Sequence, residues 1–231
     1  DIQSRIQNIP FRQVPDSLEF QLVRARLSAQ ESNPREVVAN FDRMIEARKF
    51  GTEAAARYGL VVALLRVGDK DRARKEMALL QGLNVKSPMI DALAARTLIA
   101  VGEIEKGLAS YREALRANPN RTALIYGYVD ALFAANRAAD AVKFLDRRTD
   151  GRPADPKLYE FQARAYSALG KRLLEHSALA EVYVLQGNFP AAIEQLQIAQ
   201  KAGDGDFYQK SSVEARLKEL MAVDAENRRK P

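Results

Sequence analysis

The chain has 231 residues, of which 47% are hydrophobic and 29% are charged, the composition of a globular protein with a sizeable core. It contains no cysteine, which excludes disulfides and cysteine-based metal or redox sites. The net charge is +6, but the 36 basic residues are interspersed with 30 acidic ones, so we expect no nucleic-acid partner. No apolar run approaches the roughly 20 residues of a membrane helix, and we expect no membrane span.

Turn residues recur along the chain with a fixed period. Pro34, Gly68, Gly102, Asn136 and Gly170 lie in candidate turns, each 34 residues after the one before. A small residue follows each of the first four turns by five residues, at Ala39, Ala73, Gly107 and Ala141. Between the turns, apolar residues recur at the i, i+3, i+4 and i+7 spacing of amphipathic helices. The period therefore predicts pairs of helices that repeat along the chain.

The predicted helices, in chain order, span 17–30 and 34–48, 52–67 and 69–82, 88–101 and 103–117, 121–135 and 137–149, 155–169 and 171–186, 189–202, and 206–226. They form units near 17–50, 52–84, 88–119, 121–153 and 155–186. The turn at Gly187 follows Gly170 by only 17 residues, so helix 171–186 is also expected to begin a last unit at 171–202. We expect 206–226 to cap one repeat domain at 17–231, and 1–16 to be a connector.

The segment around Leu179 is the clearest copy of the repeat. Leu179, Ala180 and Tyr183 match the Leu-Gly-x-x-Tyr part of the tetratricopeptide pattern, with His176 in the Trp position. The small residues allow two antiparallel helices to approach closely. The chain thus resembles the tetratricopeptide family, which implies an all-α fold: a tetratricopeptide-like α-solenoid, or αα superhelix, with a C-terminal capping helix.

Residue patterns for catalysis are missing from the chain. His176 is its only histidine, so neither a His-Glu-x-x-His motif nor a histidine cluster for zinc can form. The glycine-rich phosphate loops and the Gly-x-Ser-x-Gly nucleophile motif are also missing. We therefore expect this chain to be no enzyme and to hold no cofactor or metal.

Several stretches carry a more specific resemblance. They are 16–27 (DSLEFQLVRARL), 56–74 (ARYGLVVALLRVGDKDRAR) and 179–220, which ends in GDFYQKSSVEARLKEL. These stretches resemble the carboxyl-terminal region of the M48 family of periplasmic, repeat-containing bacterial zinc peptidases. The resemblance extends over nearly the whole chain, and the ending after the shortened last repeat is its most specific part.

This resemblance implies a role in proteolysis without catalysis. In the M48 family a zinc peptidase domain precedes the repeats, which hold that domain and recruit outer-membrane β-barrel precursors and their assembly machinery. The chain would then be the protein-interaction and substrate-recruiting domain of a periplasmic metalloprotease, with zinc in an upstream peptidase domain. The alternative is a free-standing tetratricopeptide adaptor or co-chaperone-like scaffold unrelated to proteolysis.

The first helix of each unit is expected to line the concave, protein-binding face. Helical periodicity puts unit positions 2, 5, 9, 12 and 13 on that face, away from the packed positions. The residues predicted to bind an extended or partly unfolded polypeptide are Arg24, Tyr58, Arg66, Arg96, Tyr126, Asp130, Phe133, Lys157, Glu160 and Arg164. Arginines with exposed aromatics are typical of interface anchors. The alternative is that the arginines pair with neighbouring acids and only keep the face soluble.

Overall fold

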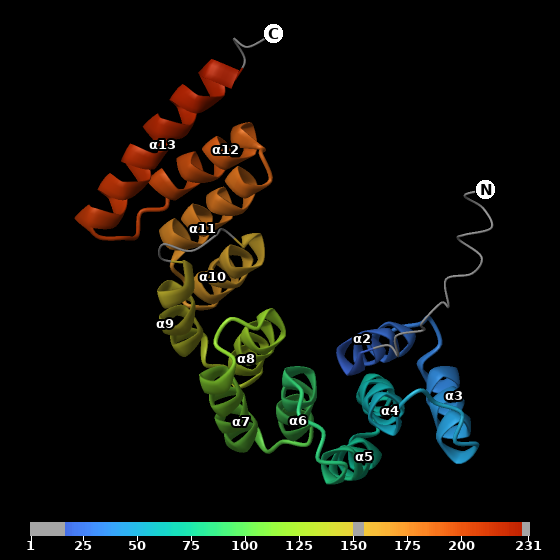
Figure 1. Ribbon diagram of the computed structural model, residues 1–231. Helices are drawn as coiled ribbons and strands as arrows, with labels where there is room; N and C mark the ends of the chain where they lie inside the picture. The colour runs from blue at the N-terminus through green and yellow to red at the C-terminus, as the bar shows by residue number, and fades with distance from the viewer. Residues whose placement is uncertain (1–16, 150–154, 228–231) are drawn as a thin grey trace, which may run out of the picture. The chain divides into compact units, whose positions relative to one another are not determined.

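The computed structural model describes residues 17–149 and 155–227 (Figure 1). These residues form twelve α-helices and no strand, which confirms the predicted all-α fold. The helices are α2 (Leu18–Ser28), α3 (Pro34–Glu46), α4 (Glu53–Val67), α5 (Lys70–Gly82), α6 (Pro88–Ala100), α7 (Ile104–Ala117), α8 (Thr122–Ala134), α9 (Ala138–Thr149), α10 (Pro156–Ala168), α11 (Arg172–Leu185), α12 (Phe189–Gln200) and α13 (Phe207–Asn227). They begin and end within two residues of the predicted ranges.

Local capping and turn chemistry explains these boundaries. Thr52 Oγ1 accepts a hydrogen bond from the Ala55 N–H at 3.3 Å, and Asp69 Oδ1 accepts one from the Arg72 N–H at 3.2 Å. Such caps satisfy amides that the first helical turn leaves open. Four of the first helices are followed within two residues by a residue with a positive φ, and these residues are Gly68, Gly102, Asn136 and Gly170. Glycine, and less often asparagine, adopts this left-handed conformation at little cost, which explains the 34-residue spacing.

The first unit does not follow that register, so the predictions that Pro34 marks its repeating turn position and that Ala39 is its packed small residue were wrong. Pro34 cannot fill the left-handed position because its ring fixes φ near −65°; it is instead the first residue of α3, after the cap Asn33. The corresponding cap of α5 is Asp69, 36 residues after Asn33. Consequently Ala39 is exposed, and Val37, 36 residues before the fully buried Ala73, occupies the packed position.

The chain divides into two compact units that meet within α8, between Gly127 and Tyr128. We call the part up to Gly127 unit 1 and the part from Tyr128 unit 2, and describe each by itself. The prediction of one repeat domain over 17–231, with its unit boundaries, stays a prediction. The expected connector at 1–16 lies outside the described residues.

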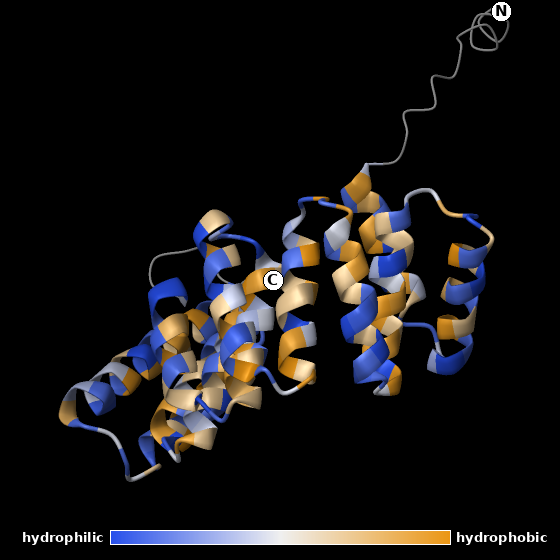
Figure 2. Cartoon of the chain, turned by 90° about the horizontal axis from the view of Figure 1, so that it is seen from below, coloured by the Kyte–Doolittle hydropathy of each residue, from blue (hydrophilic) through white to orange (hydrophobic). Residues whose placement is uncertain are grey.

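Unit 1 is built around α4. Helices α2 and α6 both pack against it, as do α3 and α5, so almost every side of α4 is covered. Leu60, Val61 and Leu64 are accordingly at most 1% exposed. A Cβ at Gly59 would lie 2.3 Å from the Phe41 ring, so the absent side chain is what lets α3 approach α4. Figure 2 shows apolar and polar residues interspersed along the helices, as expected of helices that pack on one side and meet solvent on the other.

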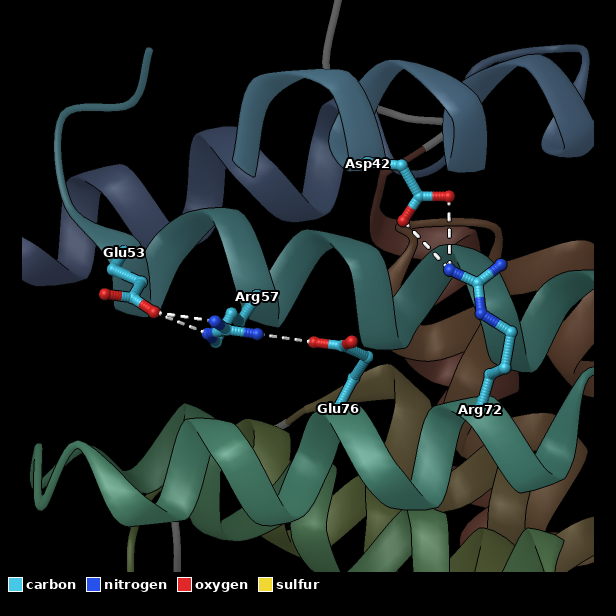
Figure 3. Close-up of polar contacts among 5 residues, drawn as sticks. All are labelled: Asp42, Glu53, Arg57, Arg72 and Glu76. Carbon is cyan, nitrogen blue, oxygen red and sulfur yellow. Dashed lines mark hydrogen bonds and ion pairs between the residues drawn. The ribbon is translucent and has the colours of Figure 1, made fainter. Parts of the chain in front are cut away.

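Ion pairs join the helices of unit 1. Figure 3 shows Arg57 of α4 between Glu53 and Glu76, with nitrogen–oxygen distances of 2.7 Å to each, and Arg72 of α5 at 2.9 Å from Asp42 of α3. Glu76 belongs to α5, so the Arg57 pair links α4 to α5, as the Arg72 pair links α5 to α3. The charges on this part of the unit are therefore matched within the chain.

Unit 2 ends in a sequence of packed helices. Helix α11 packs against both α10 and α12, and α13 packs against α12 and α11. This is the packing expected of a helix shared by two half-overlapping units, followed by a cap. Val213, Leu217 and Leu220 of α13 are buried in the same core as Leu173 and Leu196. The side chain of the single histidine, His176, joins α11 to α12, with Nδ1 2.8 Å from Gln195 Oε1.

The loop before α13 is fitted to this core. Asp204 Oδ1 accepts a hydrogen bond from the Leu173 N–H at 3.0 Å, which ties the loop to the start of α11. A Cβ at Gly205, whose φ is +93°, would lie 2.7 Å from Leu173 Cδ1. Asp204 and Gly205 of the Gly-Asp-Gly sequence therefore help to pack the loop against the start of α11.

Candidate protein-interaction surface

The ninth residue of the first helix in each repeat is charged in four of the five cases. It is Arg26 in α2, which begins at Leu18, and Arg96 in α6, which begins at Pro88. The same position is Val61 in α4, Asp130 in α8 and Arg164 in α10. All of these except Val61 are exposed, so this row presents charged side chains to solvent.

Tyr58 of α4 lies beneath the row in unit 1. It is only 4% exposed, so the prediction that it offers an exposed aromatic platform was wrong. The physical reason is non-local: α2 and α6 flank α4 and cover the side of the helix that periodicity alone left open. Burial raises the pKa of the Tyr58 phenol, and the positive charges of Arg26 and Arg96 partly oppose that rise. The guanidinium groups of Arg26 on α2 and Arg96 on α6 therefore both act on the Tyr58 phenol.

Arg24 and Arg66 were predicted to share one binding face with Tyr58 and Arg96, but the structure places both in other surroundings. Arg24 lines a separate cavity of about 270 Å³ between α2, α3 and α4. The Arg66 guanidinium donates hydrogen bonds to the backbone carbonyls of Ala29 and Glu31, the latter at 3.0 Å. Arg66 thus satisfies carbonyls that the end of α2 leaves open, which is a structural role.

Arg26 and Arg96 have neither an ion pair nor a hydrogen bond with any residue that the structure describes. The acidic residue of α2, Glu19, accepts a hydrogen bond at 3.4 Å from the Oγ of Ser87, which lies at the start of α6. This contact also joins α2 to α6. Val61 and Tyr58, which lie one turn apart on α4, are both buried and bring no negative charge. No described residue of unit 1 therefore pairs with either arginine.

In unit 2 the predicted residues pair with one another. Arg164 Nη1 lies 3.7 Å from Asp130 Oδ1, and its guanidinium carbon lies 4.1 Å from the centre of the Phe133 ring. Lys157 Nζ lies 2.6 Å from Glu160 Oε2 and 5.3 Å from the Phe161 ring centre. These contacts match the alternative in which the arginines of this face pair with neighbouring acids. The remaining predicted residue, Tyr126, is half-buried on α8 of unit 1.

Other charged groups of unit 2 are also matched. Arg216 of α13 donates two hydrogen bonds of 2.8 Å to the carboxylate of Glu181 on α11 and one of 2.8 Å to Glu219. These bonds raise the pKa of Arg216. On α10, Tyr166 donates to Asp146 Oδ1 at 3.2 Å, and burial together with that carboxylate raises the pKa of Tyr166 to about 12.

Arg26 is the residue that the sequence reasoning missed. With the register of the first unit in error, Arg24 was selected and Arg26 was not. The capping residues Ser17, Thr52 and Ser87 carry the correct signal, because they are 35 residues apart and each precedes a first helix. Counting nine residues from Ser17 and from Ser87 gives Arg26 and Arg96 directly.

Comparison with known proteins supports a repeat protein. A tetratricopeptide repeat family model matches residues 98–165, and a second matches 54–77 and 176–197. No curated protein matches the chain. In the described part of the chain, none of the helices is long and apolar enough to cross a membrane.

Two solved structures show the same fold. A tetratricopeptide repeat protein from Parabacteroides merdae is 11% identical, with 95% of this chain and 90% of that chain covered and a TM-score of 0.53. The C-terminal part of a repeat protein from Cytophaga hutchinsonii is 15% identical, with 88% and 80% covered and a TM-score of 0.59. Together with the family models, they establish an all-α tetratricopeptide solenoid. Such repeats are scaffolds for protein contacts, whose binding surface is built from successive repeats.

Proposed function

We propose that this scaffold is the substrate-recruiting domain of a periplasmic M48-like zinc metalloprotease that acts in outer-membrane protein assembly and quality control. The observation that carries the recruiting role is the pair of uncompensated arginines, Arg26 and Arg96, on the first helices of unit 1. An arginine side chain with no ion pair or hydrogen bond among the described residues is available to a partner, and arginine is enriched at interface centres. Their clients would be polypeptides in extended or partly unfolded form.

The link to proteolysis rests on the sequence resemblance, which extends to the β-barrel assembly-enhancing protease of that family. Stretches 16–27, 56–74 and 179–220 carry it. In this proposal the zinc and the catalytic residues belong to an upstream peptidase domain that the repeats hold. The barrel assembly machinery would be a further partner, and the compartment would be the periplasm.

A binding experiment tests the recruiting role. The purified chain is titrated into a fluorescently labelled outer-membrane barrel precursor, held unfolded in urea and diluted, and anisotropy is recorded. We expect saturable binding to the unfolded precursor and little binding to the same barrel once folded in detergent. Binding to neither form would contradict the proposal.

The alternative, a free-standing adaptor, is separated by two further observations. An adaptor unrelated to proteolysis would bind an unrelated unfolded protein as well as the barrel precursor. The reading frame that encodes the chain should also encode a His-Glu-x-x-His motif upstream of Asp1, and a frame without that motif would exclude the protease.

A further inference from the structure

Helices α2 and α3, the first pair of unit 1, stand apart from each other. Both pack against α4, but they do not pack on each other as α4 packs on α5 or α6 on α7 (Figure 1). Five residues, 29–33, connect α2 to α3, whereas two residues connect α4 to α5. The Arg66 guanidinium donates hydrogen bonds to the carbonyls of Ala29 and Glu31 and so fixes the longer connection. The sequence thus holds the first helix pair open.

The cavity of about 270 Å³ lies between these two helices, with residues of α4 in its wall. Val37, Phe41 and Phe50 line it with apolar atoms, and Ser28 and Asn40 add a hydroxyl and an amide group. An apolar cavity of about 150 Å³ already binds benzene. This cavity therefore has room for a large side chain, but it is too small for a helix, which is about 10 Å across.

The lining also determines the charge of the ligand. Its two charged residues, Arg24 and Glu31, have opposite signs, so the cavity offers no net charge to an ion. A charged side chain that entered this largely apolar space would lose its hydration without a matching counter-charge. A neutral apolar side chain instead gains free energy from burial.

Two features favour a polypeptide over a free apolar molecule. The hydroxyl of Ser28 and the amide of Asn40 can form hydrogen bonds with the peptide groups that flank a bound side chain, which a hydrocarbon could not use. The apolar surface also continues along α2, where Phe20, Val23 and Leu27 are exposed. Helical periodicity places these three residues next to the cavity-lining side of α2, on the side away from α4.

We propose that the cavity between α2 and α3 binds one large apolar side chain, aromatic or branched aliphatic, of an extended client polypeptide. The site rests on the proposed recruiting function and adds the residue type that is recognised. It is separate from the row of charged residues, because Arg24 and Ser28 lie on a different side of α2 from Arg26. Neighbouring apolar residues of the client cover Phe20, Val23 and Leu27.

The test uses a short peptide with a single tryptophan among serine, glycine and glutamine residues. The chain contains no tryptophan, so the emission reports on the peptide alone, and burial should shift it to the blue with saturation. Unlabelled peptides with phenylalanine or alanine in that position then compete with the probe. The phenylalanine peptide should bind about tenfold more tightly, a change equal to 1.4 kcal/mol, which burial of an aromatic side chain can supply. Added salt should change little, because no charges are paired.

A matched pair of substitutions locates the site. Ser28→Leu fills the cavity with a side chain of the protein itself and should weaken probe binding at least tenfold, with the urea midpoint retained. Ser110→Leu makes the same change at another half-buried serine of unit 1, on α7 and outside the lining, and should bind as the wild type does. Equal losses in the two variants would overturn the proposal.

Met44→Ala keeps the test decisive if Ser28→Leu does not fold. Met44 lines the cavity and is 37% exposed, so its truncation removes part of the wall at little cost in stability. The variant should bind the tryptophan peptide severalfold more weakly than the wild type. Unchanged binding would show that the peptide docks elsewhere.

Two other occupants would be recognised by different results. If the probe bound only after Phe11→Ala, the cavity would belong to residues 1–16 of the same chain. If sedimentation showed self-association of the wild type that Ser28→Leu abolishes, it would belong to a second copy. Either result would overturn the assignment to a client.

The cavity site and the recruiting function fail in distinguishable ways. If the chain binds the unfolded precursor but the phenylalanine and alanine peptides compete equally, the cavity site is wrong and the recruiting role stands. If the precursor does not bind but the probe does, in a way that Ser28→Leu abolishes, the site stands and the client is of another kind. If neither binds, both proposals are wrong.

Discussion

The two units treat the same helical position differently. In unit 1 the ninth residues of α2 and α6 are arginines with no ion pair among the described residues, whereas in unit 2 the arginine of α10 lies 3.7 Å from the aspartate of α8. Both end helices carry exposed apolar side chains, which are Phe20, Val23 and Leu27 on α2 and Phe207, Tyr208 and Met221 on α13. Helix α13 also buries Val213, Leu217 and Leu220 in the core of unit 2.

This contrast indicates that similar side chains stabilise the fold in unit 2 and are available for binding in unit 1. In unit 2 the arginines of α10 and α13 are paired with acids of the same unit. In unit 1, Arg26 and Arg96 have no ion pair or hydrogen bond among the described residues. Groups of that kind are where a partner gains most, because they need not first be released from contacts within the chain.

The largest expected effect is on the free energy of unfolding, when leucine is replaced by alanine on α13 and on α2. Leu220→Ala removes a side chain that is 2% exposed in the core of unit 2, and should lower the free energy of unfolding by about 2–5 kcal/mol. Leu27→Ala removes the same atoms from a side chain that is 63% exposed on α2, and should change it by less than about 0.5 kcal/mol. Urea unfolding followed by circular dichroism measures both.

Met221, the neighbour of Leu220, provides a control on α13 itself. Its side chain is exposed, so Met221→Ala should leave the urea midpoint nearly unchanged. If Leu27→Ala proved as costly as Leu220→Ala, the exposed face of α2 would be covered in solution and the contrast between the ends would be wrong.

A smaller effect is expected for the arginines. Arg216→Gln breaks the paired hydrogen bonds to Glu181 and should cost about 1 kcal/mol of unfolding free energy, near the upper end for partly exposed ion pairs of good geometry. Arg96→Gln breaks no bond within the described part of the chain and should cost less than about 0.5 kcal/mol. The same urea unfolding assay, repeated at high salt, should shrink the Arg216 effect. A comparable loss for Arg96→Gln would show that Arg96 has a structural role.

Much of the fold could be predicted because its signals are local. Helix limits follow from caps such as Asp69 and from left-handed residues such as Gly68, which act within a few residues of their own position. The register of the first unit failed because Pro34 falls on the 34-residue spacing without being able to adopt the conformation that the spacing marks.

The candidate site was harder to predict because its features depend on neighbouring helices. Whether Tyr58 is exposed depends on α2 and α6, and the partners of Arg66 are backbone carbonyls that no residue pattern reveals. The sequence left open whether the arginines of the face pair with acids. The structure gives a different answer in each unit: Arg164 is paired with Asp130, whereas Arg96 has no ion pair within the part of the chain that the structure describes. With the first unit in its correct register, comparing the ninth residues of neighbouring first helices would have suggested this difference.

The smallest expected effect concerns two tyrosines with opposite neighbours. Positive charges of Arg26 and Arg96 act on Tyr58, whereas a carboxylate, Asp146, acts on Tyr166. Removing both arginines with Arg26→Gln, Arg96→Gln should raise the pKa of Tyr58 further, because the tyrosinate loses stabilising charges. Asp146→Asn should lower the pKa of Tyr166 from about 12, because the tyrosinate loses a repelling one.

Both pKa values can be followed by NMR titration of protein labelled with ¹³C at the tyrosine ring. The Arg35→Gln, Arg112→Gln variant, which changes exposed arginines of α3 and α7, is the control that should leave the Tyr58 pKa unchanged.

The raised pKa of Tyr166 also implies that stability depends on pH. Its folded pKa of about 12 lies above the ordinary value of 10.0, so its contribution is complete below pH 10.0 and is lost as the pH rises through about 12. The wild type should lose unfolding free energy over that interval, and Asp146→Asn should lose less, since its Tyr166 pKa is closer to that of the unfolded chain. A Tyr58 pKa that falls in the arginine variant would show that the two guanidinium groups do not face the phenol, and the contrast between the units would lose its basis.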